Sequence, residues 1–272
     1  MRKLNRKYFA PRYPLDGIFL LGDNFYPRGI RRELSIRDPQ FNLFSNVLAA
    51  EAPEGLRFYP ILGNHDWMGD AEAQVSFSAF DARWHMPSLY YFKRFNSDDL
   101  NVCVWFIDTE FFFSDETQKR WLRDSLATER STCTWTIVNG HYPVHTGGEY
   151  TRCSILARFR NSIVPILNEN QVDLYLSGHE HQSQILKDDD HNTVYAVAGS
   201  ISDMRGERAR GNDFLRWIDS RIVGFAEINI SSTELKVIFQ RSNGGVDAEP
   251  FCQARINKAY PARPAELTLT GC

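Results

Sequence analysis

The chain has 272 residues, of which 43% are apolar and 13% aromatic, enough for one large domain or two small ones. The formal net charge of −3 gives no strong electrostatic attraction to nucleic acid, so we expect no nucleic-acid partner. No run of about 18 apolar residues occurs, so the sequence predicts no membrane-spanning helix.

The N-terminus and the cysteines bear on the compartment of the protein. Residues 1–7 are basic but lead into no apolar segment, so no signal peptide is visible. The five cysteines, at positions 103, 133, 153, 252 and 272, form no Cys-x-x-Cys pair, which gives no support to a zinc ribbon or a thioredoxin-like site. One glycosylation sequon, Asn229-Ile230-Ser231, makes the chain a candidate glycoprotein if it enters the secretory pathway.

Expected strands and helices alternate up to about residue 181, and strands dominate afterwards. We expect strands at 17–22, 57–62, 135–138, 172–176, 183–187, 193–198, 222–230 and 234–240, a hairpin at 89–95 and 102–107, and helices at 37–50, 71–82, 114–128 and 154–169. We expect residues 2–9 to end a helix and residues 204–216 to form a loop. This order predicts an α/β fold with two packed β-sheets flanked by helices, as one domain over 1–245 followed by a polar C-terminal tail over 246–272.

Four of the expected strands lead into similar loops. These loops are Gly-Asp-Asn-Phe-Tyr at 22–26, Gly-Asn-His-Asp at 63–66, Asn-Gly-His-Tyr-Pro at 139–143 and Ser-Gly-His-Glu-His at 177–181. In α/β sheets, ligands bind beyond the carboxyl ends of the strands. The loops should therefore bring six potential ligands to one place: Asp23, Tyr26, Asn64, His141, His179 and His181.

Each motif alone has a plain structural explanation. Asp23 could cap a turn or a helix, His141 could be a hydrogen-bonded core histidine, and Tyr26 could be an ordinary core or surface residue. The stretch 63–66 could be a turn, and the histidines of 177–181 could belong to a polar loop. Together the four motifs favour a shared metal site, because each places oxygen or imidazole donors beside a glycine.

The chemistry of the donors indicates the kind of metal site. Oxygen and imidazole groups without a thiolate suit iron, zinc or manganese. Six ligands exceed the four of a tetrahedral ion but suit two ions roughly 3.5–4 Å apart, bridged by a carboxylate, which can clamp the oxygens of an in-line displacement. Tyrosine has an ordinary pKa of about 10, so binding it as phenolate near neutral pH requires a strongly acidic ion such as ferric iron.

With these four blocks the sequence resembles the purple acid phosphatases of the binuclear metallophosphoesterase superfamily, above all their small, mammalian-type tartrate-resistant branch. Supporting matches are Ile107-Asp108-Thr109 and Gly224-Phe225, which leads into Glu227-Ile228. The resemblance spans about residues 10–245, and Gly-Asp-x-x-Tyr distinguishes this family from other metallophosphoesterases.

The resemblance implies a calcineurin-like metallophosphoesterase fold, a secreted or lysosomal protein, and hydrolysis of phosphoric monoesters by a metal-bound hydroxide. His65 would hold the phosphate and assist the leaving group, and Asn64 would also lie near the substrate. The implied metal ligands are Asp23, which bridges both ions, Tyr26 and His181 on Fe(III), and Asn64, His141 and His179 on a divalent iron, zinc or manganese ion.

Parts of the family pattern are missing. The family has an Asp-x-Gly block on a first strand that supplies another ferric ligand, but the lone Asp16-Gly17 belongs to the strand before Asp23, so we expect the first strand to be absent and the sequence to be truncated at its N-terminus. Tyr150 stands where the family has a histidine after Gly-His-Tyr-Pro, and His145 could bind substrate in its place or be merely solvated.

A loop of the tartrate-resistant branch is shortened here to residues 110–115, and with it goes the disulfide partner that the resemblance implies for Cys153.

Three functions therefore remain open. The leading hypothesis is an acid phosphatase with a phosphomonoester substrate and a binuclear Fe(III)–M(II) centre. The alternative is a catalytically impaired member that uses the fold as a binding or scaffold protein, because a ferric ligand and a histidine near the substrate are missing. A related phosphodiesterase is the third possibility, against which Tyr26 and the short loops argue. The sequence does not specify the oligomeric state.

Overall fold

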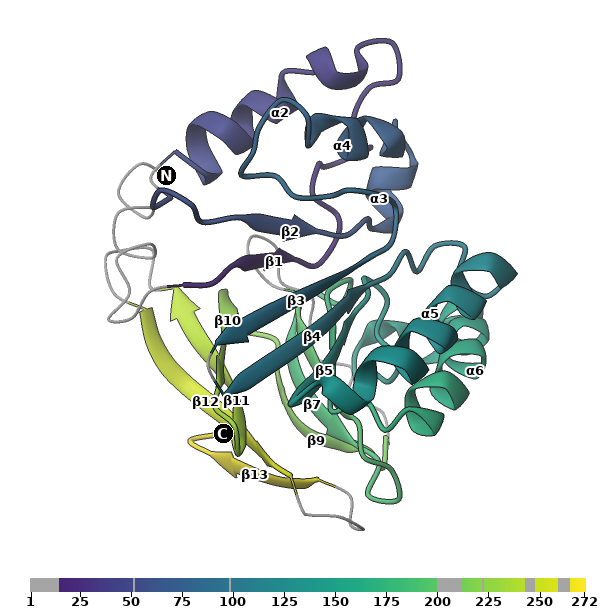
Figure 1. The fold of residues 1–272 in the computed structure, drawn as a ribbon, viewed down its shortest axis with the longest axis vertical. Coiled ribbons are helices and arrows are strands. Elements are labelled where there is room, and N and C mark those ends of the chain that lie inside the picture. The colour runs from purple at the N-terminus through teal and green to yellow at the C-terminus, as the bar shows by residue number, and fades with distance from the viewer. Residues whose placement is uncertain are drawn as a thin grey trace.

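The computed structural model of the chain describes residues 15–50, 52–97, 99–199, 212–221, 223–242, 248–258 and 265–272. Within these ranges, β-sheets form the centre of the molecule and helices lie outside them (Figure 1). The strands are β1 (Ile18–Leu20), β2 (Phe58–Pro60), β3 (Tyr91–Ser97), β4 (Leu100–Phe106), β5 (Trp135–Asn139), β6 (Leu174–Ser177), β7 (Ser183–Lys187), β8 (Val194–Ala198), β9 (Leu215–Asp219), β10 (Gly224–Ile230), β11 (Glu234–Ser242), β12 (Ala248–Asn257) and β13 (Glu266–Thr270). The α-helices are α2 (Gln40–Leu43), α3 (Asn64–Trp67), α4 (Ala71–Phe77), α5 (Glu116–Glu129) and α6 (Ser154–Glu169). Short 3-10 or π-helical segments are η1 (Ser35–Arg37), η2 (Phe44–Leu48), η3 (Arg130–Thr132) and η4 (Glu149–Arg152).

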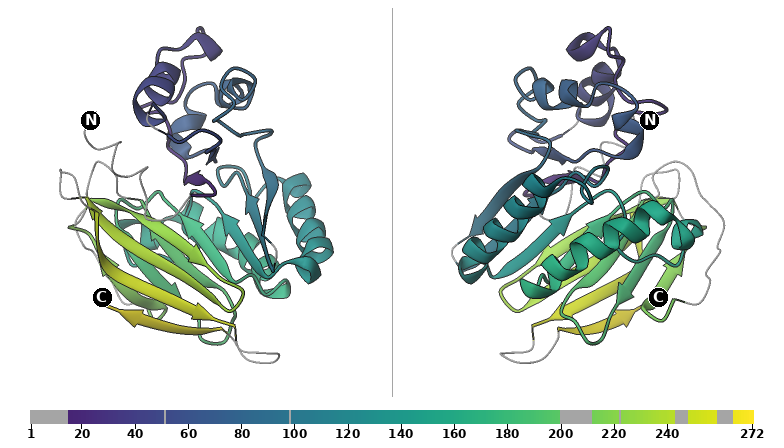
Figure 2. Two further views of the ribbon diagram at one scale, coloured as in Figure 1. Left: turned by 60° about the vertical axis from the view of Figure 1, so that its left-hand side comes forward. Right: turned by 90° about the vertical axis from the view of Figure 1, so that its right-hand side faces the viewer.

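The largest sheet of the described residues has seven strands in the order β3-β4-β5-β6-β8-β7-β9. Its central strands β4, β5, β6 and β8 are parallel, and β3, β7 and β9 pair antiparallel at the two sides. Strands β1 and β2 form a separate parallel pair, and β10 to β13 form an antiparallel sheet of four. Helices α5 and α6 lie side by side on one face of the large sheet (Figure 2).

Strand β4 shows how the two cores form on either side of this sheet. Cys103 and Trp105 belong to the core beneath α5 and α6, whereas Val104 and Phe106 belong to the core shared with the other two sheets. Side chains alternate between the two faces of a strand, so a strand that is apolar throughout must be covered on both sides. The predicted architecture of packed sheets flanked by helices is thus confirmed.

The two long helices follow the sequence patterns that predicted them. Asp115 accepts hydrogen bonds from the backbone N–H groups of Thr117 and Gln118 at 3.0 Å, and so caps the start of α5. Phe159 and Ile163, spaced one helical turn apart, are buried on the inner side of α6. No helix within the described ranges offers an apolar stretch long enough to cross a membrane.

Several elements differ from the sequence-based expectations. The helix expected at 37–50 is broken into η1, α2 and the π-helical η2, and the short helix α3 was not predicted. Residues 215–219, partly expected to be loop, form β9. The expected tail supplies β12 and β13, which extend the four-stranded sheet beyond β11. Residues 2–9, where the end of a helix was expected, and 204–211 lie outside the described residues.

Two disulfides join parts of the described structure. Cys103 of β4 is bonded to Cys133, which follows η3, and Cys252 of β12 is bonded to Cys272, which follows β13. Cys153 is a free cysteine, in agreement with the missing partner that the family resemblance implied.

Removing the Cys252–Cys272 disulfide should destabilise the protein. The bond joins residues 20 positions apart, and closing a loop of that length in the unfolded chain corresponds to about 3 kcal/mol. We expect the double variant Cys252→Ala/Cys272→Ala to lose about this free energy of unfolding in urea denaturation without reductant. Cys153→Ala is the matched control, because it removes a thiol that is in no disulfide. A loss below about 1 kcal/mol in the double variant would mean that strand pairing alone holds β13.

Candidate metal centre

The loop after β1 turns sharply and places Asp23 against two other loops. Gly22 and Asp23 have φ angles of +85° and +55°, in the left-handed region that favours glycine. A Cβ at Gly22 would lie 2.5 Å from Nδ1 of His141, and a Cβ at Gly63 would lie 2.1 Å from Oδ1 of Asp23. The glycines of these motifs therefore allow three loops to approach one another closely.

The carboxylate of Asp23 is the meeting point of these loops. Its Oδ1 accepts a hydrogen bond from the backbone N–H of His65 at 2.9 Å, and its Oδ2 accepts one from the hydroxyl of Tyr26 at 2.9 Å. Nε2 of His141 lies 3.3 Å from the same Oδ2. Burial opposes the charge of Asp23, but the interactions with His141, His65 and Tyr26 outweigh it and hold the pKa of Asp23 well below its usual range.

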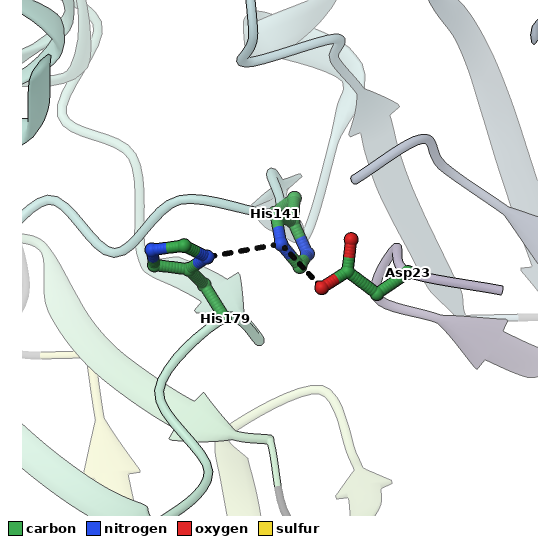
Figure 3. A group of neighbouring side chains, drawn as sticks. All are labelled: Asp23, His141 and His179. Atoms are coloured by element: carbon green, nitrogen blue, oxygen red, sulfur yellow. Dashed lines mark hydrogen bonds and ion pairs between the residues drawn. The ribbon is translucent and has the colours of Figure 1, made fainter. Parts of the chain in front are cut away.

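Three of the six potential metal-ligating side chains, here called donors, lie on one side of Asp23. Oδ1 of Asn64 lies 3.2 Å from Nε2 of His141 and 3.1 Å from Nδ1 of His179, and the two histidine nitrogens are 3.2 Å apart. The other ring nitrogen of His141 donates to the carbonyl oxygen of Leu21 at 2.7 Å, so Nε2 is directed at Asp23 and His179 (Figure 3).

Two donors gather on the other side. The hydroxyl of Tyr26 lies between Oδ2 of Asp23, at 2.9 Å, and Nε2 of His181, at 3.2 Å. The side chains expected as ligands thus form two sets, and Oδ2 of Asp23 takes part in both.

The spacing of these atoms suits metal coordination. Ligand atoms about 2.0–2.2 Å from one ion lie roughly 3.0–3.5 Å from each other, because of the angles between the bonds. The contacts among the six donors, at 2.9–3.3 Å, have this spacing. The ligand atoms of Asp23, His141 and His179 all lie within 4.8 Å of one another. The residues present therefore fit a centre of oxygen and imidazole ligands.

The other predicted site residues have different surroundings. His65 donates from Nδ1 to the carbonyl of Pro27 at 2.6 Å, and its ring lies 4.3 Å from that of Tyr26, beside the donors. His145 instead packs against the rings of Tyr195 and Phe214, at 4.8 and 4.7 Å. Burial, aided by the charge of Arg160, lowers the pKa of His145 to about 4. These contacts favour a packing role for His145, and its assignment to substrate binding stays an untested prediction.

A buried carboxylate that sequence analysis did not single out ties two of the loops together. Asp66 accepts hydrogen bonds from the backbone N–H groups of Gly63, Asn24 and Phe25, at 2.9, 3.0 and 3.2 Å. The side-chain amide of Gln74 donates to it at 2.8 Å. Asp66 lies in the same motif as Asn64 and His65, and this was the only feature of the sequence that connected it with the site. Its hydrogen-bond partners can be recognised only in the folded chain.

A second buried carboxylate lies behind α3. Oδ1 of Asp108 accepts a hydrogen bond from the indole of Trp67 at 2.9 Å, and the backbone of Asp108 is paired twice with the side chain of Gln118. Burial raises the pKa of Asp108 to about 6, although the hydrogen bonds from Trp67 and Glu110 oppose this shift. Asp108 thus joins the end of β4 to the helix that carries Asn64 and His65.

Asp108 should make stability depend on pH. Its carboxyl group keeps a proton up to about pH 6 when folded, against 3.8 for the ordinary group. Its contribution is therefore complete below about pH 4, decreases as pH rises to about 6 and is constant above, a total of about 3 kcal/mol. We expect Asp108→Asn, compared with the native protein by urea denaturation in EDTA, to remove this decrease. Parallel stability profiles of the two proteins between pH 4 and 7 would contradict the assignment.

Comparison with known proteins places this arrangement in a family. A sequence profile described as Calcineurin-like phosphoesterase matches residues 2–183. Tartrate-resistant acid phosphatase type 5 of Mus musculus is 30% identical over 258 aligned residues, covering 84% of this chain and 76% of the mouse protein. The Homo sapiens protein of the same name is 31% identical with the same coverage. Purple acid phosphatase 17 of Arabidopsis thaliana is 32% identical over 211 aligned residues, covering 69% of this chain and 59% of the plant protein.

Solved structures have the same fold. GAP50, described as the anchor in the inner membrane complex of Plasmodium, superposes with a TM-score of 0.74 and 25% identity, covering 90% of this chain and 81% of GAP50. The purple acid phosphatase PPD1 from yellow lupin, Lupinus luteus, has a TM-score of 0.68 at 14% identity, covering 94% of this chain and 49% of the lupin chain. The chain therefore belongs to the calcineurin-like phosphoesterase family, and within it is similar to the purple acid phosphatases.

Proposed function

We propose that this protein is an acid phosphatase that hydrolyses phosphoric monoesters at a binuclear centre of Fe(III) and a divalent iron, zinc or manganese ion. The observation that carries the proposal is the convergence of six donors from four loops into two sets that share Oδ2 of Asp23. The similarity to acid phosphatases from animals and plants supports it.

The two sets suit different ions. Tyr26 and His181 would hold the ferric ion together with Asp23, because a phenolate ligand calls for a strongly acidic ion. Asn64, His141 and His179 would hold the divalent ion together with Asp23. Once bound, two such ions supply an activated water molecule and hold the oxygens of the phosphoryl group.

His65 is the residue that we propose to act on the substrate itself. The hydrogen bond from its Nδ1 to Pro27 and the contact with the ring of Tyr26 fix the orientation of the imidazole beside the donors. The free ring nitrogen, Nε2, is then available to hold the phosphoryl group and to protonate the leaving oxygen.

Two neighbouring substitutions test the proposal. Asn64→Ala should lower the content of divalent metal and abolish phosphatase activity, because it removes a ligand atom. His65→Ala should keep both metals but lower kcat, because it removes a group that acts mainly in the transition state. Elemental analysis and turnover of an aryl phosphate monoester measure both effects. Full metal content in Asn64→Ala would remove Asn64 from the metal site. Loss of metal in His65→Ala would make His65 a ligand.

A scaffold function is the second candidate. The observation that favours it is the TM-score of 0.74 to GAP50, a protein described as an anchor. In the described residues, Asp23 is also the sole carboxylate within the six-donor cluster, so the ferric set has one fewer acidic ligand than the family pattern. The same measurements distinguish the two candidates, because a scaffold would bind no iron, show no ferric–tyrosinate colour and turn over no ester.

We also propose that the protein passes through the secretory pathway. Its two disulfides are typical of proteins from oxidising compartments. Asn229 of the sequon is exposed on β10, and its amide donates a hydrogen bond to Glu227 at 2.9 Å. Expressed in a eukaryotic secretory host, the protein should carry a glycan at Asn229, seen as a mass shift that endoglycosidase treatment reverses. Asn229→Gln should abolish the shift, and an unmodified native chain in that host would argue against the proposal.

A further inference from the structure

The ring of His179 is held between two tyrosines. The ring of Tyr150 lies 4.6 Å away at an interplanar angle of 32°, which is close to stacking. The ring of Tyr142 lies 4.7 Å away at 75°, in an edge-on arrangement. Between them, Nδ1 of His179 is directed at Asn64 and His141, at 3.1 and 3.2 Å. The ring of His179 thus contacts one aromatic ring on each of two sides.

Tyr150 is itself fixed by the residue next to His179 in the chain. Its backbone N–H donates to Oε1 of Glu180 at 3.0 Å, and the hydroxyl of Thr146 donates to the same oxygen at 2.8 Å. The side chain of Glu180 is fully buried. A Cβ at Gly148 would lie 2.6 Å from this carboxylate, so the loop over 146–150 is packed directly against it.

Tyr142 is fixed in a similar way on the other side. Its hydroxyl donates a hydrogen bond to the carboxylate of Glu110, and its backbone carbonyl accepts one from the hydroxyl of Tyr175 at 2.8 Å. The two tyrosines on either side of His179 are therefore held in place by contacts that do not involve the donors themselves.

We infer that Tyr150 is a positioning residue, which holds His179 in the orientation that presents Nδ1 to the divalent ion, and that Glu180 holds Tyr150 in place. The inference rests on the proposed metal centre. Residues that contact a metal-ligating side chain without binding the metal themselves typically change metal affinity about 10- to 100-fold when they are substituted. Here the contact is made by the face of the aromatic ring, so the ring should be required and its hydroxyl should be dispensable.

A pair of substitutions at Tyr150 separates these two parts of the side chain. Tyr150→Phe keeps the ring and should keep the native affinity for Zn²⁺, measured by competition with a chelator. Tyr150→Leu removes the ring and should weaken Zn²⁺ binding about tenfold. Tyr90→Leu is the matched control, because Tyr90 is also partly buried and its ring contacts Trp121 at 4.8 Å. Tyr90→Leu should leave the affinity unchanged.

A second variant keeps the ring of Tyr150 and loosens its support. Thr146→Val removes the hydroxyl that donates to Glu180, and should weaken Zn²⁺ binding in the same direction as Tyr150→Leu but less. Equal losses in Tyr150→Phe and Tyr150→Leu would assign the role to the hydroxyl and overturn the inference. Native affinity in Tyr150→Leu would overturn it as well.

A readout without metal separates this inference from the proposed function. In metal-free protein labelled with ¹⁵N-histidine, the ring signals of His179 should report one orientation in the native protein and in Tyr150→Phe. They should broaden or divide in Tyr150→Leu. If the native protein bound no Zn²⁺ but the NMR result held, the proposed metal centre would fail while the positioning by Tyr150 stood. Unchanged His179 signals in Tyr150→Leu would refute the positioning itself.

Discussion

The candidate centre depends on the buried carboxylate of Asp66, which connects the loop after β1 with the loop after β2. Its oxygens accept three backbone N–H groups and one side-chain amide from these loops and from α4. Asn24 adds a hydrogen bond from its amide to the carbonyl of Ile61 at 2.8 Å. A carboxylate with this many donors fixes several backbone segments at once, because a buried donor left without its acceptor costs about 1–3 kcal/mol. The positions of Asp23, Tyr26 and Asn64 follow from this arrangement.

The other half of the centre is built on the large sheet. Strands β5 and β6 are parallel neighbours, so the loops that follow them begin at the same edge. The backbone N–H of Gly178 donates to the carbonyl of His141 at 3.1 Å, and the imidazole of His141 donates to Leu21. This second bond reaches from the large sheet to the loop after β1. The small β1–β2 sheet and the seven-stranded sheet are therefore joined at the donors themselves as well as through the shared core.

The convergence of these side chains could be predicted from the sequence because each lies shortly after an apolar strand, in a loop that contains a glycine. Those signals are local, and the structure brings all six predicted ligands together. Strand β12 was missed because its buried side chains include small ones, such as Cys252 and Ala254, so the alternation is weak against polar neighbours. The helix expected at 37–50 is interrupted where α2 gives way to the π-helical η2, and Leu43 and Leu48 are exposed although both are apolar. Pairs such as Asp66 with Gln74 and Glu180 with Thr146 depend on tertiary contacts, which periodicity does not reveal.

The shared position of Asp23 has a thermodynamic consequence. Its Oδ2 lies next to Tyr26 in one set and to His141 in the other. In the proposed binuclear centre, an ion that enters either set would therefore have to reorganise the hydrogen bonds of a carboxylate that belongs to both. The occupancies of the two sets are then coupled, and by linkage each ion changes the affinity of the other by the same factor. Orienting Asp23 for the first ion lowers the cost of binding the second, while repulsion between two cations acts in the opposite direction. A binding isotherm for one metal would therefore describe such a centre only at a stated occupancy of the other.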